Sequence, residues 1–428
     1  MYNASEVVLA CFLLLVFCQL FFEIYLISLN MAHARSHRRE VPEFFRSWID
    51  QQTFEKSVDY TIDKGKFSLI ASVWSAALIA GFLAFRVFGR VDAWIGSLEL
   101  NYYVQALLFL FSISIIFSIL SLPFSYYSTF VIEKKYNFNK STLGIFALDF
   151  VKGILLSILL GSPILLLILW FMRFVGQFWW VWGFVAFAGF QLIVLYIYPT
   201  LIAPIFNKFT PLMAGELKDA IENLAKKLAF EVSGIFLMDG SKRSSHGNAY
   251  FTGFGKKKRI VMFDTLIEQL SKDQALAVLA HEIGHEKKGH VKRLLAVSLL
   301  VTFVGFWALS QLISYQPLYS AFGFSIPSDY AILLIVSFLF SPIMYFVQPL
   351  FSSLSRRYEY EADAFSVNAM NNSKPLIDAL LSISKKSLSN LVPHPLFSFF
   401  HYSHPTLQER INAMQDFGKR KLGASDNV

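Results

Sequence analysis

Seven apolar runs of about 20 residues decide what kind of fold this sequence can adopt. They cover residues 7–29, 67–85, 103–122, 153–172, 178–198, 294–313 and 330–351. About 20 helical residues cross the ~30 Å hydrocarbon core of a bilayer, because each residue of an α-helix rises 1.5 Å. Six of the runs contain no Asp, Glu, Lys or Arg, and the first contains only Glu23. We therefore expect a mainly α-helical, polytopic membrane protein with seven transmembrane helices.

The composition excludes several other classes of protein. Hydrophobic residues make up 55% of the 428 residues and charged residues only 16%, whereas soluble domains carry about 25% charged residues. A disordered or collagen-like chain is therefore excluded. The two cysteines, Cys11 and Cys18, both lie in the first apolar run, so a disulfide framework or a cysteine-based metal site is not expected.

The distribution of basic residues predicts the orientation in the membrane. If the seven runs cross the bilayer alternately, 35 of the 38 Lys and Arg residues face one side, and only Arg86, Arg90 and Arg173 face the other. Basic residues concentrate on the cytoplasmic side, so we expect an outside or lumenal N-terminus and a cytoplasmic C-terminus. This asymmetry accounts for the net charge of +8 without a nucleic-acid partner. It suits a bacterial inner membrane and an endoplasmic reticulum membrane equally.

Glu23, within the first run, has two interpretations. An intramembrane carboxylate is a candidate functional group by default. Glu23 also lies near the cytoplasmic end of its run, where its side chain can reach the interface. We favour this structural interpretation.

The remaining chain predicts one cytoplasmic domain built from two pieces. Residues 1–198 hold the first five spans, 294–351 hold the last two, and the pieces 199–293 and 352–428 lie between and after them. Within the first piece we expect an amphipathic helix at 215–228, a strand at 232–238, and a hairpin formed by 248–255 and 259–263. The basic cluster 256–259 is interpreted as a solvated turn in preference to a contact with anionic lipid.

The motif that carries chemistry is H-E-x-x-H at residues 281–285. On a helix, His281 and His285 lie about 40° apart, so both imidazoles face one side and can bind one Zn²⁺ ion. Glu282 lies beside them and can polarise a water molecule on the metal. The alternative is an amphipathic helix whose polar face carries two histidines by chance. His290 is not expected to be a ligand, because on a continuous helix it lies about 180° away from His281.

The second cytoplasmic piece offers a third metal ligand. Glu359 and Asp363 are four residues apart and share a helix face, whereas Glu361 points away from both. We assign Glu359 as the third ligand and Asp363 as the carboxylate that holds the ring of a liganding histidine. The alternative is ordinary surface pairing of these acids with Arg356 and Arg357.

These residues, taken together with eight further segments, resemble the type I CAAX prenyl endopeptidases, which are integral-membrane zinc metallopeptidases. The resemblance covers nearly the whole chain, through LPFS (122–125), FVIE (130–133), FNK (138–140), PIFNKFTPL (204–212), GNAY (247–250), RIVMFDTL (259–266), HP (404–405) and ER (409–410). It implies a ring of seven helices around an intramembrane chamber, capped by a zincin-like metalloprotease domain that contains a small β-hairpin. It also implies that His281, His285 and Glu359 bind one zinc ion and that Glu282 is the general base.

The resemblance implies three further site residues. Asn248 is expected to hydrogen-bond the substrate backbone, and His404 and Arg410 are expected to stabilise the oxyanion of the scissile carbonyl. The interpretation of residues 404–405 as a simple turn before a C-terminal helix stays open. One departure from the family pattern is Gly247, which follows His246 where a serine is usual.

Three functions remain possible from the sequence. The first is a CAAX-type endopeptidase that removes the last three residues from a prenylated protein or peptide. The second is a quality-control metalloprotease that cleaves other membrane-associated polypeptides without needing a prenyl group. The third, of another class, is a non-enzymatic transporter or lipid-handling protein whose zinc is structural. A structural zinc site usually has four protein ligands, whereas this sequence offers three, which favours catalysis.

Overall fold

The computed structural model describes residues 3–253 and 258–425, and long helices dominate them. Among these residues, seven helical segments are long and apolar enough to cross a membrane: Ala4–His37, Gln51–Ala84, Tyr102–Glu133, Leu143–Phe174, Gly176–Phe206, His290–Leu312 and Asp329–Met370. Each coincides with one predicted apolar run. The prediction of seven spans is therefore confirmed.

The helices α1 (Ala4–His37), α2 (Gln51–Ala84), α4 (Tyr102–Tyr127), α5 (Leu143–Phe174), α6 (Trp179–Ile197), α11 (His290–Leu312) and α13 (Asp329–Met370) form the spans. The polar side chains of Asn3, Asp50, Thr142 and Ser328 accept backbone N–H groups at the starts of α1, α2, α5 and α13. Such caps satisfy donors that a helix leaves unpaired at its first turn. Several of these helices are longer than their apolar runs, so their ends extend from the membrane part into the polar domain.

Shorter elements complete the fold. They are η1 (Glu43–Phe45), α3 (Val87–Gly96), η2 (Ser128–Glu133), η3 (Gly176–Phe178), η4 (Tyr198–Ile202), α7 (Ala203–Phe206), α8 (Glu216–Lys227), η5 (Gly240–Lys242), α9 (Asp264–Ile267), α10 (Lys272–Lys287), α12 (Gln316–Ala321), α14 (Lys374–Lys386), α15 (Pro395–His401) and α16 (Leu407–Ser425). The predicted amphipathic helix at 215–228 coincides with α8.

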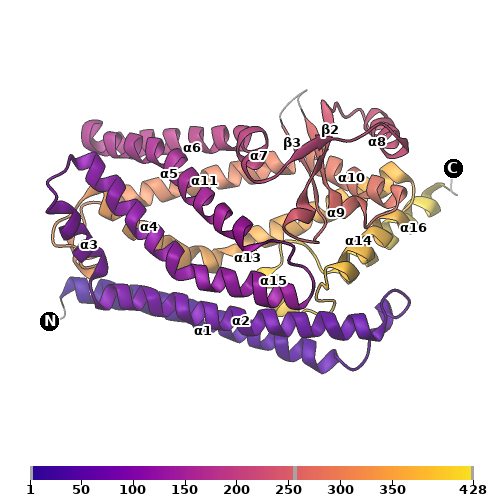
Figure 1. The fold of residues 1–428 in the computed structure, drawn as a ribbon, viewed down its shortest axis with the longest axis horizontal. Helices are drawn as coiled ribbons and strands as arrows, with labels where there is room; N and C mark the ends of the chain where they lie inside the picture. Colours follow the sequence, from indigo (N-terminus) through magenta and orange to yellow (C-terminus); the bar gives the residue numbers. More distant parts are fainter. Residues whose placement is uncertain (1–2, 254–257, 426–428) are drawn as a thin grey trace.

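A four-stranded sheet lies at one end of the molecule, beside α8 and α10 (Figure 1). Its strands β1 (Phe209–Pro211), β2 (Gly234–Met238), β3 (Ala249–Thr252) and β4 (Arg259–Phe263) are arranged in the order β1-β2-β4-β3. The β3–β4 pair is antiparallel, as predicted, and β2 runs parallel to β4. Residues 254–257, which include part of the predicted basic turn, lie outside the described residues. β3 lies at an edge of the sheet, and its outer side pairs with no strand of the described residues.

The membrane half and the polar domain have separate apolar cores. Phe12, Phe88 and Phe109 are buried in the core of the membrane half. A second core joins the polar ends of α1 and α2 to α14 and α16, and a third lies beneath the sheet and α10. Figure 1 shows the long helices spread along the molecule, with the sheet, α8, α10, α14 and α16 gathered at the end away from the N-terminus. Within the membrane half, Ser72 donates a hydrogen bond to Glu23 at 2.9 Å.

Helix α13 connects the two halves directly. Its 42 residues begin in the last predicted span and continue without a break into the polar domain, so the predicted boundary between 351 and 352 falls inside this helix. Glu359 and Asp363 lie near its end. The membrane part therefore positions these two carboxylates through one rigid element.

Candidate metal centre

Helix α10 presents the H-E-x-x-H motif. Ser271 caps the helix start and forms a reciprocal capping box with Gln274, and alanine-rich sequence follows. The helix ends at Lys287, and Gly289 then adopts a positive φ of 70°, which glycine accommodates at little cost. His281 and His285 consequently lie one turn apart on the same face of a well-terminated helix, as predicted.

Small residues bring α10 against α13. Ala277, Ala280 and Gly284 of α10 are buried in this contact, and Ala362 of α13 is fully buried. A Cβ atom at Gly284 would lie only 3.0 Å from Phe365 Cβ and 3.2 Å from Ala362 Cα. This close approach places the end of α13 beside the two histidines.

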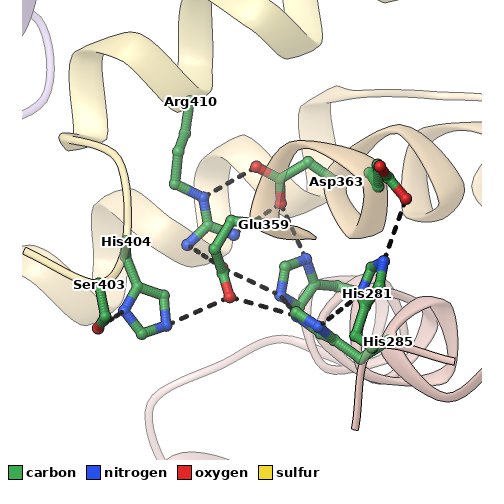
Figure 2. A network of polar contacts seen from close by, with 9 residues as sticks. His281, His285, Glu359, Asp363, Ser403, His404 and Arg410 are labelled. Carbon is green, nitrogen blue, oxygen red and sulfur yellow. Dashed lines mark hydrogen bonds and ion pairs between the residues drawn. The ribbon is translucent and has the colours of Figure 1, made fainter. Parts of the chain in front are cut away.

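Three donor atoms converge between the two helices. His281 Nε2 and His285 Nε2 lie 3.1 Å apart, and Glu359 oxygens lie 3.5 Å from the first and 3.3 Å from the second. In tetrahedral coordination with bonds of ~2.0–2.1 Å, neighbouring donors lie about 3.3 Å apart. The three residues form a group that can hold a metal ion (Figure 2).

The environment of Glu359 agrees with a metal site. The residue is buried, with a relative exposure of 4%. Its Oε2 atom accepts no hydrogen bond from the described residues and lies 3.3 Å from Nη1 of Arg410. A buried carboxylate oxygen is costly unless a cation or donor satisfies it. The three protein donors therefore fit a metal ion that keeps a further position open.

Asp363 lies next to His281, and its role in holding the ring of this histidine stays a prediction. Its Oδ1 atom lies 2.9 Å from His281 Nδ1, on the side of the ring opposite the donor atom Nε2. A carboxylate in this position can hold the ring of a liganding histidine in its orientation.

Arg410 is buried against the two carboxylates of α13. It donates two hydrogen bonds to Asp363, at 2.8 and 2.6 Å, and its Nη1 atom lies 3.3 Å from Glu359. The side chain is 8% exposed, on α16. Figure 2 shows the guanidinium directed toward the Asp363 carboxylate. In this geometry Arg410 neutralises and holds the two carboxylates, and its expected contact with an oxyanion stays a prediction.

His404 lies at the open side of the centre. Its Nε2 atom is 3.4 Å from Glu359 Oε1, and its Nδ1 atom is 3.0 Å from Ser403 Oγ. The residue is exposed and lines, with Arg410, a cavity of about 1080 Å³ whose other walls include residues of α1, α2, η2, α5 and α14. A peptide in this cavity would meet His404 beside the candidate metal ligand Glu359.

Glu282 lies next to a candidate metal ligand in the sequence of α10, whereas Asn248 lies just before β3. Burial raises the pKa of Glu282, which follows His281 on α10. A carboxylate with a raised pKa is suited to accept a proton near neutral pH. Asn248 is exposed just before β3, and its side chain accepts a hydrogen bond from the Ala249 N–H at 2.9 Å. Its contact with substrate stays a prediction.

The departure at Gly247 has a local explanation. A Cβ atom there would lie 3.0 Å from Leu266 Cα. Such a distance is below ordinary van der Waals contact, so glycine lets the segment before β3 pack closely against α9.

Sequence reasoning missed His290 and Glu361. On one continuous helix His290 would lie opposite His281, but α10 ends at Lys287 and His290 begins α11. His290 Nδ1 lies 3.0 Å from His285 Nδ1, and His290 Nε2 lies 3.2 Å from Glu361 Oε2. The glycine two residues after a lysine-rich helix end was the available signal for this break.

A membrane-spanning helical fold that carries this donor set defines the class of integral-membrane metallopeptidases. Family models agree: residues 30–208 match the CAAX prenyl protease N-terminal domain of five membrane helices, and residues 211–417 match peptidase family M48. The chain therefore belongs to the CAAX prenyl protease 1 family and is a CAAX-type membrane metalloendopeptidase.

Individual relatives extend over nearly the whole chain. A CAAX prenyl protease 1 homolog of Oryza sativa subsp. japonica is 39% identical over 96% of this chain and 97% of its own. CAAX prenyl protease 1 of Saccharomyces cerevisiae is 37% identical, covering 89% of this chain and 90% of its own. The crystal structure of S. mikatae Ste24p has a TM-score of 0.89 at 34% identity and covers 97% of this chain and 99% of that one. The alternative of a non-enzymatic transporter is therefore wrong.

Proposed function

We propose that this protein is a zinc endopeptidase that removes the C-terminal tripeptide from prenylated proteins or peptides. The observation that carries this proposal is the triangle of donor atoms from His281, His285 and Glu359 beside a peptide-sized cavity. Two imidazole nitrogens and one carboxylate oxygen are a typical donor set for catalytic zinc. We propose one zinc ion per chain.

Each side chain of the site then has its own role in the proposed hydrolysis. Zinc, when bound, supplies Lewis acidity, which polarises a peptide carbonyl and makes water more acidic. Glu282 takes the proton from the attacking water and passes it to the leaving amine. His404 and Arg410 donate to the developing oxyanion, a role supported for His404 by its place 3.4 Å from Glu359.

The substrate peptide is proposed to bind as an added strand along β3. Support comes from the position of β3 at the edge of the sheet, where its outer backbone groups have no strand partner among the described residues. Asn248, immediately before this strand, would hold the peptide backbone through its side-chain amide.

We propose that the catalytic domain faces the cytoplasm and that the membrane is that of the endoplasmic reticulum. The concentration of Lys and Arg on the side of the catalytic domain supports this orientation. The rice and yeast relatives, both eukaryotic, favour an internal membrane over the bacterial inner membrane.

Cleavage of matched C-terminal peptides, farnesylated and unmodified, tests the proposal. Purified protein should release a tripeptide from the farnesylated peptide alone, and a chelator should stop the reaction. Equal cleavage of both peptides would instead support a quality-control protease that does not require a prenyl group. Failure to cleave either peptide with zinc bound would overturn the proposed substrate class.

A further inference from the structure

His290 is a buried histidine in direct contact with a metal-donor histidine. It begins α11, after the break at Gly289, and its relative exposure is 1%. Its Nδ1 atom lies 3.0 Å from Nδ1 of His285, within hydrogen-bond distance. The contact involves the nitrogen of His285 that does not face the other donors.

The pattern of distances determines where the protons lie. His285 Nε2 belongs to the donor triangle, so it must be unprotonated to bind a metal, and the proton of the neutral ring lies on Nδ1. That N–H then donates to Nδ1 of His290. The remaining His290 proton is on Nε2, which lies 3.2 Å from Glu361 Oε2 and donates to it. One arrangement of protons therefore satisfies the whole chain from Glu361 to His285.

The surroundings hold His290 in this position. Its ring stacks on Tyr358 with centroids 4.3 Å apart and planes inclined by 10°. Glu361 is in turn held by Arg357, at 3.4 Å, with Arg293 4.0 Å away. The His290 ring is thus buried and packed, and the carboxylate that contacts it is itself paired with arginine.

From this geometry we infer that His290 is a positioning residue that fixes the ring orientation and tautomer of His285, and that Glu361 does the same for His290. The two histidines of the motif then have different supports. Asp363, tied to Arg410, holds His281, and the His290–Glu361 pair holds His285. The inference rests on the metal site of the proposed function but not on its substrate.

Two substitutions at the same position separate hydrogen bonding from packing. His290→Phe keeps a ring that can stack on Tyr358 but leaves the His285 N–H without an acceptor. His290→Asn loses the ring but presents an oxygen close to the former position of Nδ1. Loss of partners that orient a metal ligand typically weakens metal binding about 10–100-fold. We expect that loss for His290→Phe and recovery of most of the affinity for His290→Asn.

The readouts do not depend on catalysis. Zinc affinity is measured by competition with a chelator, and the cobalt-substituted protein is compared by its visible absorption, which reports ligand geometry. Tyr358→Phe, which keeps the stacked ring, is the matched control and should bind zinc within about threefold of wild type. The thermal midpoint of the metal-free protein shows whether each variant is folded.

The results distinguish this inference from the proposed function. Wild-type zinc affinity and an unchanged cobalt spectrum in His290→Phe would overturn the inference. If that variant does not fold, Glu361→Leu carries the test, because it removes the acceptor for His290 and should weaken zinc binding in the same direction. Failure of wild-type protein to cleave prenylated peptides would overturn the proposed substrate and leave this result unaffected.

Discussion

At the scale of single residues, helix spacing brings the two candidate donor histidines together, whereas tertiary packing brings up the residues that contact them. The spacing of His281 and His285 requires only that four residues on a helix return to one face, which is a local property. His290 depends on where that helix stops, and Arg410 depends on how α16 packs against α13. Tertiary packing decides both, so residue spacing alone could not reveal them.

Glu282 gives the most direct test of the chemistry. Glu282→Gln keeps the shape of the side chain but removes the base that accepts the water proton. We expect loss of at least about 100-fold in kcat, the lower range for general acid–base catalysis, while zinc stays bound at one ion per chain. Peptide cleavage and metal content are measured on the same preparation. Turnover close to that of wild type would contradict the role of general base.

Arg410 tests the charge balance of the site. Arg410→Met removes the cation that contacts Asp363 and Glu359 and leaves two buried carboxylates without it. Breaking a buried pair in this way costs about 3–5 kcal/mol. We expect a clearly lower thermal midpoint for the metal-free protein, and a smaller decrease for Arg410→Lys, which keeps the charge but not the paired hydrogen bonds. An unchanged midpoint in Arg410→Met would show that the carboxylates do not need this cation.

At the scale of elements, the predicted helices and hairpin agree with the structure because their apolar periodicity is local. The predicted domain boundary between 351 and 352, in contrast, does not coincide with the end of a helix. A change from apolar to charged sequence marks the membrane surface, but α13 crosses it without interruption. Composition shows where lipid ends and does not show where a helix ends. This continuous helix lets the membrane part position Glu359 rigidly.

Gly284 tests the contact between α10 and α13. A leucine there would force the helices apart, because even a Cβ atom would lie 3.0 Å from Phe365 Cβ. We expect Gly284→Leu to lose zinc binding, and Gly284→Ala to destabilise the fold by about 1–3 kcal/mol through overpacking. Gly305→Ala is the matched control, since a Cβ atom at Gly305 meets no atom within 4 Å. Metal content and thermal midpoints are measured for each variant. Normal zinc binding in Gly284→Leu would show that the metal site does not depend on the close contact between α10 and α13.

At the scale of the whole molecule, hydropathy predicted the number of spans but not the cavity, and the orientation inferred from charge stays a prediction. The cavity of about 1080 Å³ is lined by residues of α1, α2, η2, α5 and α14 and by the segment that carries His404, which are far apart in the sequence. No local pattern encodes such a space, because it depends on how distant elements meet. The apolar runs establish that the helices span the membrane, and packing establishes what lies between them.

The orientation predicted from the basic residues can be tested with single cysteines. In a background lacking Cys11 and Cys18, Glu222→Cys places a thiol on exposed α8, and Ser97→Cys places one on the exposed segment after α3. A membrane-impermeant maleimide added to sealed microsomes should label position 222 directly and position 97 only after detergent is added. This pattern follows because basic residues stay on the cytoplasmic side during insertion. The reverse pattern would put the metal centre in the lumen and would exclude cytoplasmic substrates.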